Sequence, residues 1–103
     1  MLGPWQEEVL DWLYDRGSLT AKQAERIVRY RQCEARASAC IANHGVDDSF
    51  SQGLLQEMAR ILVSVDAASD DHSYAGDGER ILKSLAKRGL SERVERRPWL
   101  YSC

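Results

Sequence analysis

The sequence contains no uninterrupted apolar segment approaching the length of about 20 residues that a membrane-spanning helix requires. Its first residues also lack the basic stretch followed by an apolar one that marks a secretory signal peptide. Only three cysteines are present, an odd number that does not favour a disulfide framework. Cys33 and Cys40 are separated along a predicted helix by a rise of about 10.5 Å, too far for a disulfide. We therefore expect a cytoplasmic protein that does not enter a membrane.

The sequence also lacks the short motifs of common enzyme sites, such as a nucleophile elbow, a phosphate-binding loop or a metalloprotease helix. Cys40 and His44 could share one helical face as two metal ligands, with His72 and Cys103 completing a tetrahedral site. Strong zinc motifs, however, come as two closely spaced ligand pairs, and the second pair is missing. We expect no enzymatic activity, no metal and no cofactor.

Apolar residues at helical spacing predict four main helices. The first covers residues 4–16. The second begins at Ala21, because Thr20 and Gln23 form a capping box, and nothing stops it before residues 43–45.

The third helix, residues 54–65, has the most clearly two-sided pattern, so we predict that it is the central core helix. Its inward residues recur at helical spacing: Leu54, Leu55, Met58, Ile61, Leu62 and Val65. The fourth helix covers residues 78–88, with Asp77 as its cap and Gly89 as its stop. Between these two helices lies a predicted acidic loop, residues 66–77.

The predicted fold class is therefore all-α: a single domain over residues 1–103, built as a compact bundle of four main helices. The ending is ambiguous. Residues 91–103 fit a short helix followed by an extended tail, or a short C-terminal β-hairpin that turns at Arg97-Pro98, as in a winged helix.

Charge is distributed unevenly along the chain. Residues 79–103 hold seven basic and three acidic side chains, a net charge of +4, whereas residues 1–78 hold seven basic and thirteen acidic ones, a net charge of −6. Such a division indicates a basic contact region, residues 78–103, on an acidic body. Alternatively, the two parts simply attract one another.

The predicted fourth helix and the tail carry the best candidate site for nucleic acid or another partner. On the helix, four residues recur at the spacing of an outward face: Arg80, Lys83, Ser84 and Lys87. The tail adds three cations and two aromatic residues: Arg93, Arg96, Arg97, Trp99 and Tyr101. The alternative is a solvated helix face followed by a tail that packs on the core.

The long second helix has a mixed face on which small residues surround a possible ion pair. A homodimer through this face is a second hypothesis, and its residues are Ile27, Arg31, Glu34, Ala35 and Ile41.

Residues 81–93 resemble the recognition helix and first wing strand of winged-helix DNA-binding domains, in which such a helix ends in Lys-Arg-Gly-Leu before a hairpin wing. The resemblance makes residues 94–101 the wing, and residues 9–20 are similar to the family's first helix and short strand. Residues 17–23 are also similar to a helix-turn-helix start in bacteriophage DNA-processing proteins. The family places its second helix directly before the recognition helix, whereas here a long helix, another helix and an acidic loop intervene.

The resemblance implies DNA binding by the basic residues of the fourth helix and wing. We expect a small, non-enzymatic regulatory protein of phage or mobile-element type that contacts nucleic acid through its C-terminal helix and tail. The alternative is a protein-directed inhibitor or adaptor, of the anti-CRISPR or anti-activator type, that blocks a host protein or nucleoprotein complex.

Overall fold

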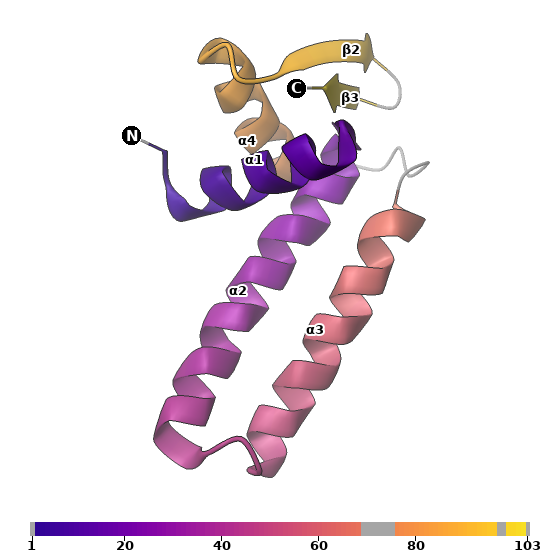
Figure 1. Ribbon diagram of the computed structural model, residues 1–103. Coiled ribbons are helices and arrows are strands. Elements are labelled where there is room, and N and C mark those ends of the chain that lie inside the picture. The colour runs from indigo at the N-terminus through magenta and orange to yellow at the C-terminus, as the bar shows by residue number, and fades with distance from the viewer. Residues whose placement is uncertain (1, 69–75, 97–98, 103) are drawn as a thin grey trace.

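The computed structural model describes residues 2–68, 76–96 and 99–102. Over these residues the chain forms four packed helices and three short strands (Figure 1). This confirms the predicted all-α class. The elements, in chain order, are α1 (Pro4–Arg16), β1 (Ser18–Thr20), α2 (Ala21–His44), α3 (Ser49–Ala67), α4 (Gly76–Lys87), β2 (Glu92–Arg96) and β3 (Trp99–Ser102).

The first two helices have the boundaries that the sequence predicts. Gly17 ends α1 with a positive φ of 83°, and its N–H donates to the carbonyl of Leu13 at 2.8 Å. The capping box starts α2: the Gln23 N–H donates to the Thr20 hydroxyl at 3.1 Å, and the Thr20 N–H donates to the Gln23 side chain at 2.9 Å. Gly45 ends α2, so the helix is 24 residues long.

The molecule consists of a head and a projecting arm (Figure 1). The head contains α1, the beginning of α2, α4 and the strands. In the arm, residues 29–64, the remainder of α2 and most of α3 lie antiparallel and side by side. Because the arm projects, the molecule is elongated, with extents of 44 × 30 × 22 Å.

The core lies in the head, where α1, β1, α2 and α4 meet. Its buried apolar residues are Val9, Leu10, Leu13, Leu19, Ala21, Ala24, Ile27, Val28, Val65, Ile81, Leu82 and Leu85.

The prediction that α3 is the central core helix is wrong. Val65 is the one α3 residue in the core cluster, and α3 packs along α2 instead. Leu62 is 40% exposed, and its neighbour Val63 is 72% exposed. The apolar pattern predicted a helix correctly, but it did not show that α3 packs chiefly on a single neighbouring helix.

The position of α4 differs slightly from the prediction, because the helix begins at Gly76 and Asp77 lies in its first turn. Of the predicted acidic loop, Asp66 belongs to α3 and Asp77 to α4, and residues 69–75 lie outside the described part.

The three strands form one antiparallel sheet with the order β1-β3-β2. Tyr101 of β3 pairs with Leu19 on one side and with Arg93 on the other, and a bulge interrupts β2 between Arg93 and Glu95. Of the two predicted endings, the structure therefore has the hairpin. Its turn at Arg97-Pro98 lies outside the described residues.

None of the described helices is both long enough and apolar enough to span a membrane.

Candidate nucleic-acid interface

Helix α4 turns one apolar face to the core and one charged face to solvent. Ile81, Leu82 and Leu85 are buried. The exposed residues of α4 and its C-terminal end include four cations, Arg80, Lys83, Lys87 and Arg88. The first three are the outward positions that the sequence predicted, and Arg88 adds a fourth.

Gly78 sets how closely α4 approaches α2. A Cβ atom at this position would overlap the backbone of α2, where it would meet the carbonyl oxygen of Ala21 and the amide nitrogen of Glu25 and lie 2.8 Å from the Glu25 Cα. Only a residue without a side chain fits there. The first turn of α4 is thus held directly against the first turns of α2.

Ser84 does not lie on the outward face where the sequence placed it. It is half-buried, and its hydroxyl accepts a hydrogen bond from the Gln6 side chain at 2.7 Å and donates to the carbonyl of Ile81 at 2.7 Å. Since both interactions are internal, Ser84 joins α1 to α4.

Two of the cations on α4 form ion pairs with acidic residues of the same helix. Arg80 lies 2.9 Å from Asp77, and Lys83 lies 2.8 Å from Glu79. The Arg80 and Asp77 side chains are 78% and 51% exposed, and exposed pairs of this kind contribute about 0.2–1 kcal/mol at most. A phosphate could therefore displace the carboxylates at little cost. Within the described residues, Lys87 makes no ion pair.

The end of α4 directs the chain into the hairpin. Gly89, with a φ of 74°, donates to the carbonyl of Ala86 at 3.0 Å, and Leu90 donates to the carbonyl of Leu85 at 3.0 Å. These two hydrogen bonds form a Schellman motif at Gly89, the residue that the sequence predicted as the stop of the helix. Because β2 starts three residues after Gly89, the hairpin begins beside the C-terminal end of α4.

The structure describes the backbone of four tail candidates but not their side chains. Arg93 and Arg96 lie in β2, and Trp99 and Tyr101 lie in β3. Arg97 lies outside the described residues.

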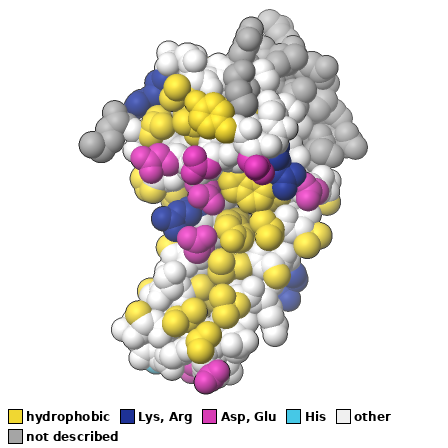
Figure 2. All heavy atoms as spheres, in the orientation of Figure 1, with side chains coloured by type: hydrophobic (Ala, Val, Ile, Leu, Met, Phe, Trp, Pro, Cys, Tyr) yellow, Lys and Arg dark blue, Asp and Glu magenta, His cyan; other side chains and the backbone are white. Residues whose placement is uncertain are grey.

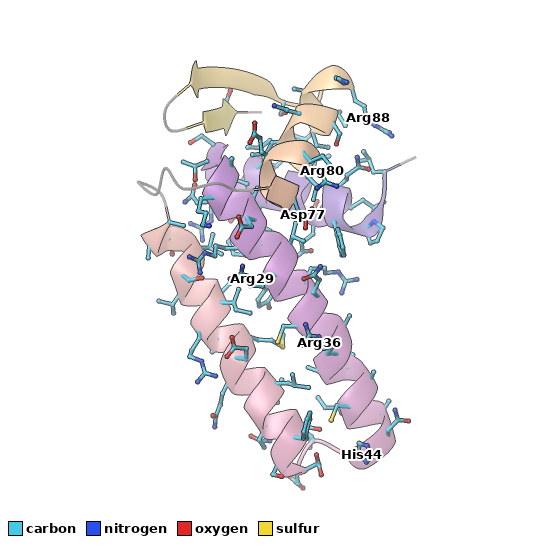
Figure 3. All side chains as sticks on the ribbon, turned by 180° about the vertical axis from the view of Figure 1, so that it is seen from behind. Arg29, Arg36, His44, Asp77, Arg80 and Arg88 are labelled. Atoms are coloured by element: carbon cyan, nitrogen blue, oxygen red, sulfur yellow. The ribbon has the colours of Figure 1, made fainter. Side chains whose placement is uncertain are left out.

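A row of basic residues that the sequence analysis missed continues from α4 along α2. Figure 3, which views the molecule from behind, shows Arg88, Arg80, Arg29, Arg36 and His44 in succession toward the tip of the arm, with Asp77 between Arg80 and Arg29. Arg29 and Arg80 both line a groove of about 470 Å³ between the two helices, together with their ion-pair partners Glu25 and Asp77. Arg29 and Arg36 are separated by seven positions, so helical spacing alone places them on one face of α2, but it does not place that face beside α4.

The opposite side of the head is acidic. Glu7, Asp11 and Asp15 are exposed on α1, and Figure 2 shows a group of acidic side chains at the level of α1. On this side Arg16 pairs with Asp66 of α3 and stacks on the Trp12 ring at 4.7 Å. The head therefore has a basic back and an acidic front.

The predicted dimer face is not a continuous surface. Ile27 is fully buried in the core, which excludes it from any contact with a second molecule. Arg31 and Glu34 pair with each other at 3.0 Å, Ala35 is exposed and Ile41 is half-buried.

The described residues contain no group of three or more metal-ligating side chains. Cys33 and Cys40 are free thiols, while His72 and Cys103, weighed above as ligands, lie outside the described residues.

No protein-family model matches the chain, and no curated protein or solved structure shows a significant match to it.

Proposed function

We propose that this protein binds double-stranded nucleic acid through the exposed face of α4 and the adjoining β2–β3 hairpin, in the manner of winged-helix domains. The contact is chiefly to phosphates, because the side chains that carry it are lysines and arginines. Arg80, Lys83 and Lys87 would bind the backbone from α4, and Arg88 would extend that contact toward the hairpin.

The observation that carries the proposal is the close packing of α4 on the start of α2 at Gly78. The resemblance requires the second helix to lie beside the recognition helix, whereas in the sequence α3 and an acidic loop separate the two helices. Because α3 runs back along α2, the chain returns to the head before α4 begins (Figure 1). The intervening residues are therefore accommodated as an arm, and the contact between α4 and α2 supports the helix pair that the resemblance implies.

Two acidic residues near α4, Asp66 and Asp77, could repel nucleic acid, but each forms an ion pair with an arginine. Asp66 is engaged by Arg16 of α1, and Asp77 is paired with Arg80 in an exposed bond. Neither leaves an unpaired carboxylate next to Lys87. Asp70 and Asp71 lie outside the described residues.

The test is charge reversal with a matched control. Lys87→Glu changes one exposed cation on α4, and Arg60→Glu makes the same change in net charge on α3. We expect Lys87→Glu to weaken binding to a mixed-sequence duplex at low salt by about tenfold or more, and Arg60→Glu to change it by less than about twofold. Fluorescence anisotropy across a salt series measures both effects.

The salt dependence supplies a second measure of the same contact. The slope of log K against log salt should become shallower by about one for Lys87→Ala, since one fewer counterion is released. Equal losses for Lys87→Glu and Arg60→Glu would mean that net charge alone governs binding. Failure of the unmodified protein to bind a duplex at low salt would refute the proposal.

A second candidate function is a protein-directed inhibitor or adaptor. It is favoured by the tip of the arm, where Phe50 is 73% exposed and lines a groove of about 610 Å³ together with Arg36, Cys40 and Leu54. Affinity capture from a bacterial lysate, with and without nuclease, separates the two functions. A stoichiometric protein partner that persists after nuclease treatment would favour this candidate.

A further inference from the structure

The apolar stripe of α3 is wider than the surface that α2 covers. Leu55, Met58 and Leu62 recur at helical spacing along one flank of α3, and none of them belongs to the core cluster. Leu62 is 40% exposed, and Leu55 and Met58 are half-buried. The intramolecular fold therefore leaves part of this stripe uncovered.

This flank lies on the front of the arm. Phe50 and Leu54 occupy the other flank, since they line the groove with Arg36, whose side chain is seen from behind in Figure 3. Leu55 follows Leu54 by about 100° around the helix and so turns toward the front. Asp66, one turn beyond Leu62, reaches Arg16 of α1, which crosses in front of α2 (Figure 1).

Helix α2 contributes apolar residues to the same side. Tyr30 and Ile41 are half-buried, and they recur with Glu34 at helical spacing on the α2 flank that faces away from Arg36. Figure 2 shows hydrophobic side chains in a band down the front of the arm. We call this band the seam, and its residues are Tyr30, Ile41, Leu55, Met58 and Leu62.

We propose that the seam is a homodimer contact, in which the arms of two copies pack front to front as a four-helix bundle. A two-helix arm buries only the inner face of each helix, and a second two-helix arm supplies the complementary apolar layer. Pairing with a second copy requires a surface that complements itself.

Two ion pairs beside the seam are compatible with that requirement. Arg31 pairs with Glu34 at 3.0 Å, and Arg16 pairs with Asp66, so each of these pairs is neutral, while Glu8 lies near Tyr30 as a further carboxylate. Each pair can exchange partners across a two-fold axis. A nucleic acid would find no excess of cations here, in contrast to the back of the molecule.

The area of the arm is sufficient for a dimer of moderate affinity. The α2 part of the arm, from Arg29 to His44, is about 24 Å long, and two adjacent helices are about 20 Å wide. The flat footprint is thus about 500 Å² per copy, or about 1,000 Å² for two copies, which is the lower limit of a specific interface. Side chains add to that area. An interface at this lower limit is typical of a weak dimer, so we expect monomer and dimer both to be present at accessible concentrations.

Sedimentation equilibrium of the full chain, without nucleic acid, tests the proposal from low micromolar to several hundred micromolar protein. The expected mass rises from 11.7 kDa toward twice that value. Leu62→Lys places a charge in the seam and should weaken dimerisation by about tenfold or more. Val63→Lys is the matched control, because Val63 is the next residue, is 72% exposed and points about 100° away from the seam. It should leave dimerisation unchanged.

Three results would overturn the proposal: a monomeric mass for the unmodified protein at every concentration, equal effects of Leu62→Lys and Val63→Lys, or dissociation by Phe50→Lys but not by Leu62→Lys. The last result would place the contact on the groove at the back of the tip. Circular dichroism melting curves establish that each variant is folded. Since no nucleic acid is present, the outcome is independent of the proposed DNA binding.

Discussion

At the scale of single residues, Gly78 has the greatest influence on the candidate interface. Any side chain there would collide with backbone atoms of Ala21 and Glu25, and backbone atoms cannot rotate away as a side-chain end can. The glycine is buried inside a helix, where its high conformational freedom is unfavourable by about 1 kcal/mol relative to alanine. The close helix contact that it permits offsets that cost.

Gly78→Ala should destabilise the protein by about 1–3 kcal/mol, because overpacking outweighs the gain in helix propensity. Gly53→Ala in α3 is the matched control, since a Cβ atom there meets no other atom within 4 Å. It should stabilise the protein by about 0.5–1 kcal/mol. Urea unfolding measures both. Changes of the same sign would contradict the close packing of α4 on α2.

Tyr30 should make stability depend on alkaline pH. Burial, together with the nearby carboxylates of Glu34 and Glu8, raises its pKa above the ordinary value of 10.0. The folded state thus retains the phenolic proton at a pH where the unfolded chain loses it, so stability is unaffected below pH 10 and falls as the pH rises above it. Tyr30→Phe should remove the part of the tyrosinate absorbance change that Tyr30 contributes above pH 10. It should also reduce the loss of folding stability at alkaline pH. An unchanged alkaline loss would show that Tyr30 does not cause it.

At the scale of elements, helical periodicity predicted where α1, α2 and α4 form but not which surfaces they meet. Ser84 illustrates the limit. Its spacing from Arg80 and Lys87 places it near the outward face, yet α1 approaches that edge of α4 and its Gln6 donates a hydrogen bond to the Ser84 hydroxyl. Ser84 is therefore a structural residue in the head.

Ser84→Ala should cost more stability than the equivalent change in α3. Ser64 makes the same bond to a carbonyl three residues earlier, at 2.6 Å to Ile61, and in the described structure it makes no bond to another helix. The difference between Ser84→Ala and Ser64→Ala should thus report the lost Gln6 bond, at about 1 kcal/mol in urea unfolding. Affinity for a duplex should change little in either variant. Equal stability losses would indicate that the Gln6 bond contributes nothing.

At the scale of the whole molecule, the separation of surfaces is the main feature. The back carries a row of cations from α4 onto α2, the front of the head is acidic, and the front of the arm is apolar (Figures 2 and 3). The proposed nucleic-acid contact and the proposed dimer contact therefore use different sides, and both can be occupied at once. In a front-to-front dimer the two basic backs face away from each other, so each copy would contact a separate duplex or a separate segment of nucleic acid.

Sequence alone predicted the basic outward positions Arg80, Lys83 and Lys87, because the alternation of apolar and charged residues along α4 fixes which side is buried. It did not predict that Arg29 lies across a groove from Arg80, since these residues are distant in the chain and only the packing of α4 on α2 brings them together. It also assigned Ile27 to a dimer face, because an apolar residue on a helix predicts burial but not the partner that buries it.

The sequence by itself determined where the helices form. The signals are local, and each acts within a few positions: the capping box at Thr20, the stops at Gly17 and Gly89 and the spacing of apolar residues. Tertiary structure decided what those helices pack against. Helix α3 is the most apolar of the four helices, yet it lies along α2 and leaves Leu62 partly exposed, because the head is already filled by α1, α2 and α4. Whether a residue is buried depends on which elements pack against its own, and no single segment of the sequence specifies that packing.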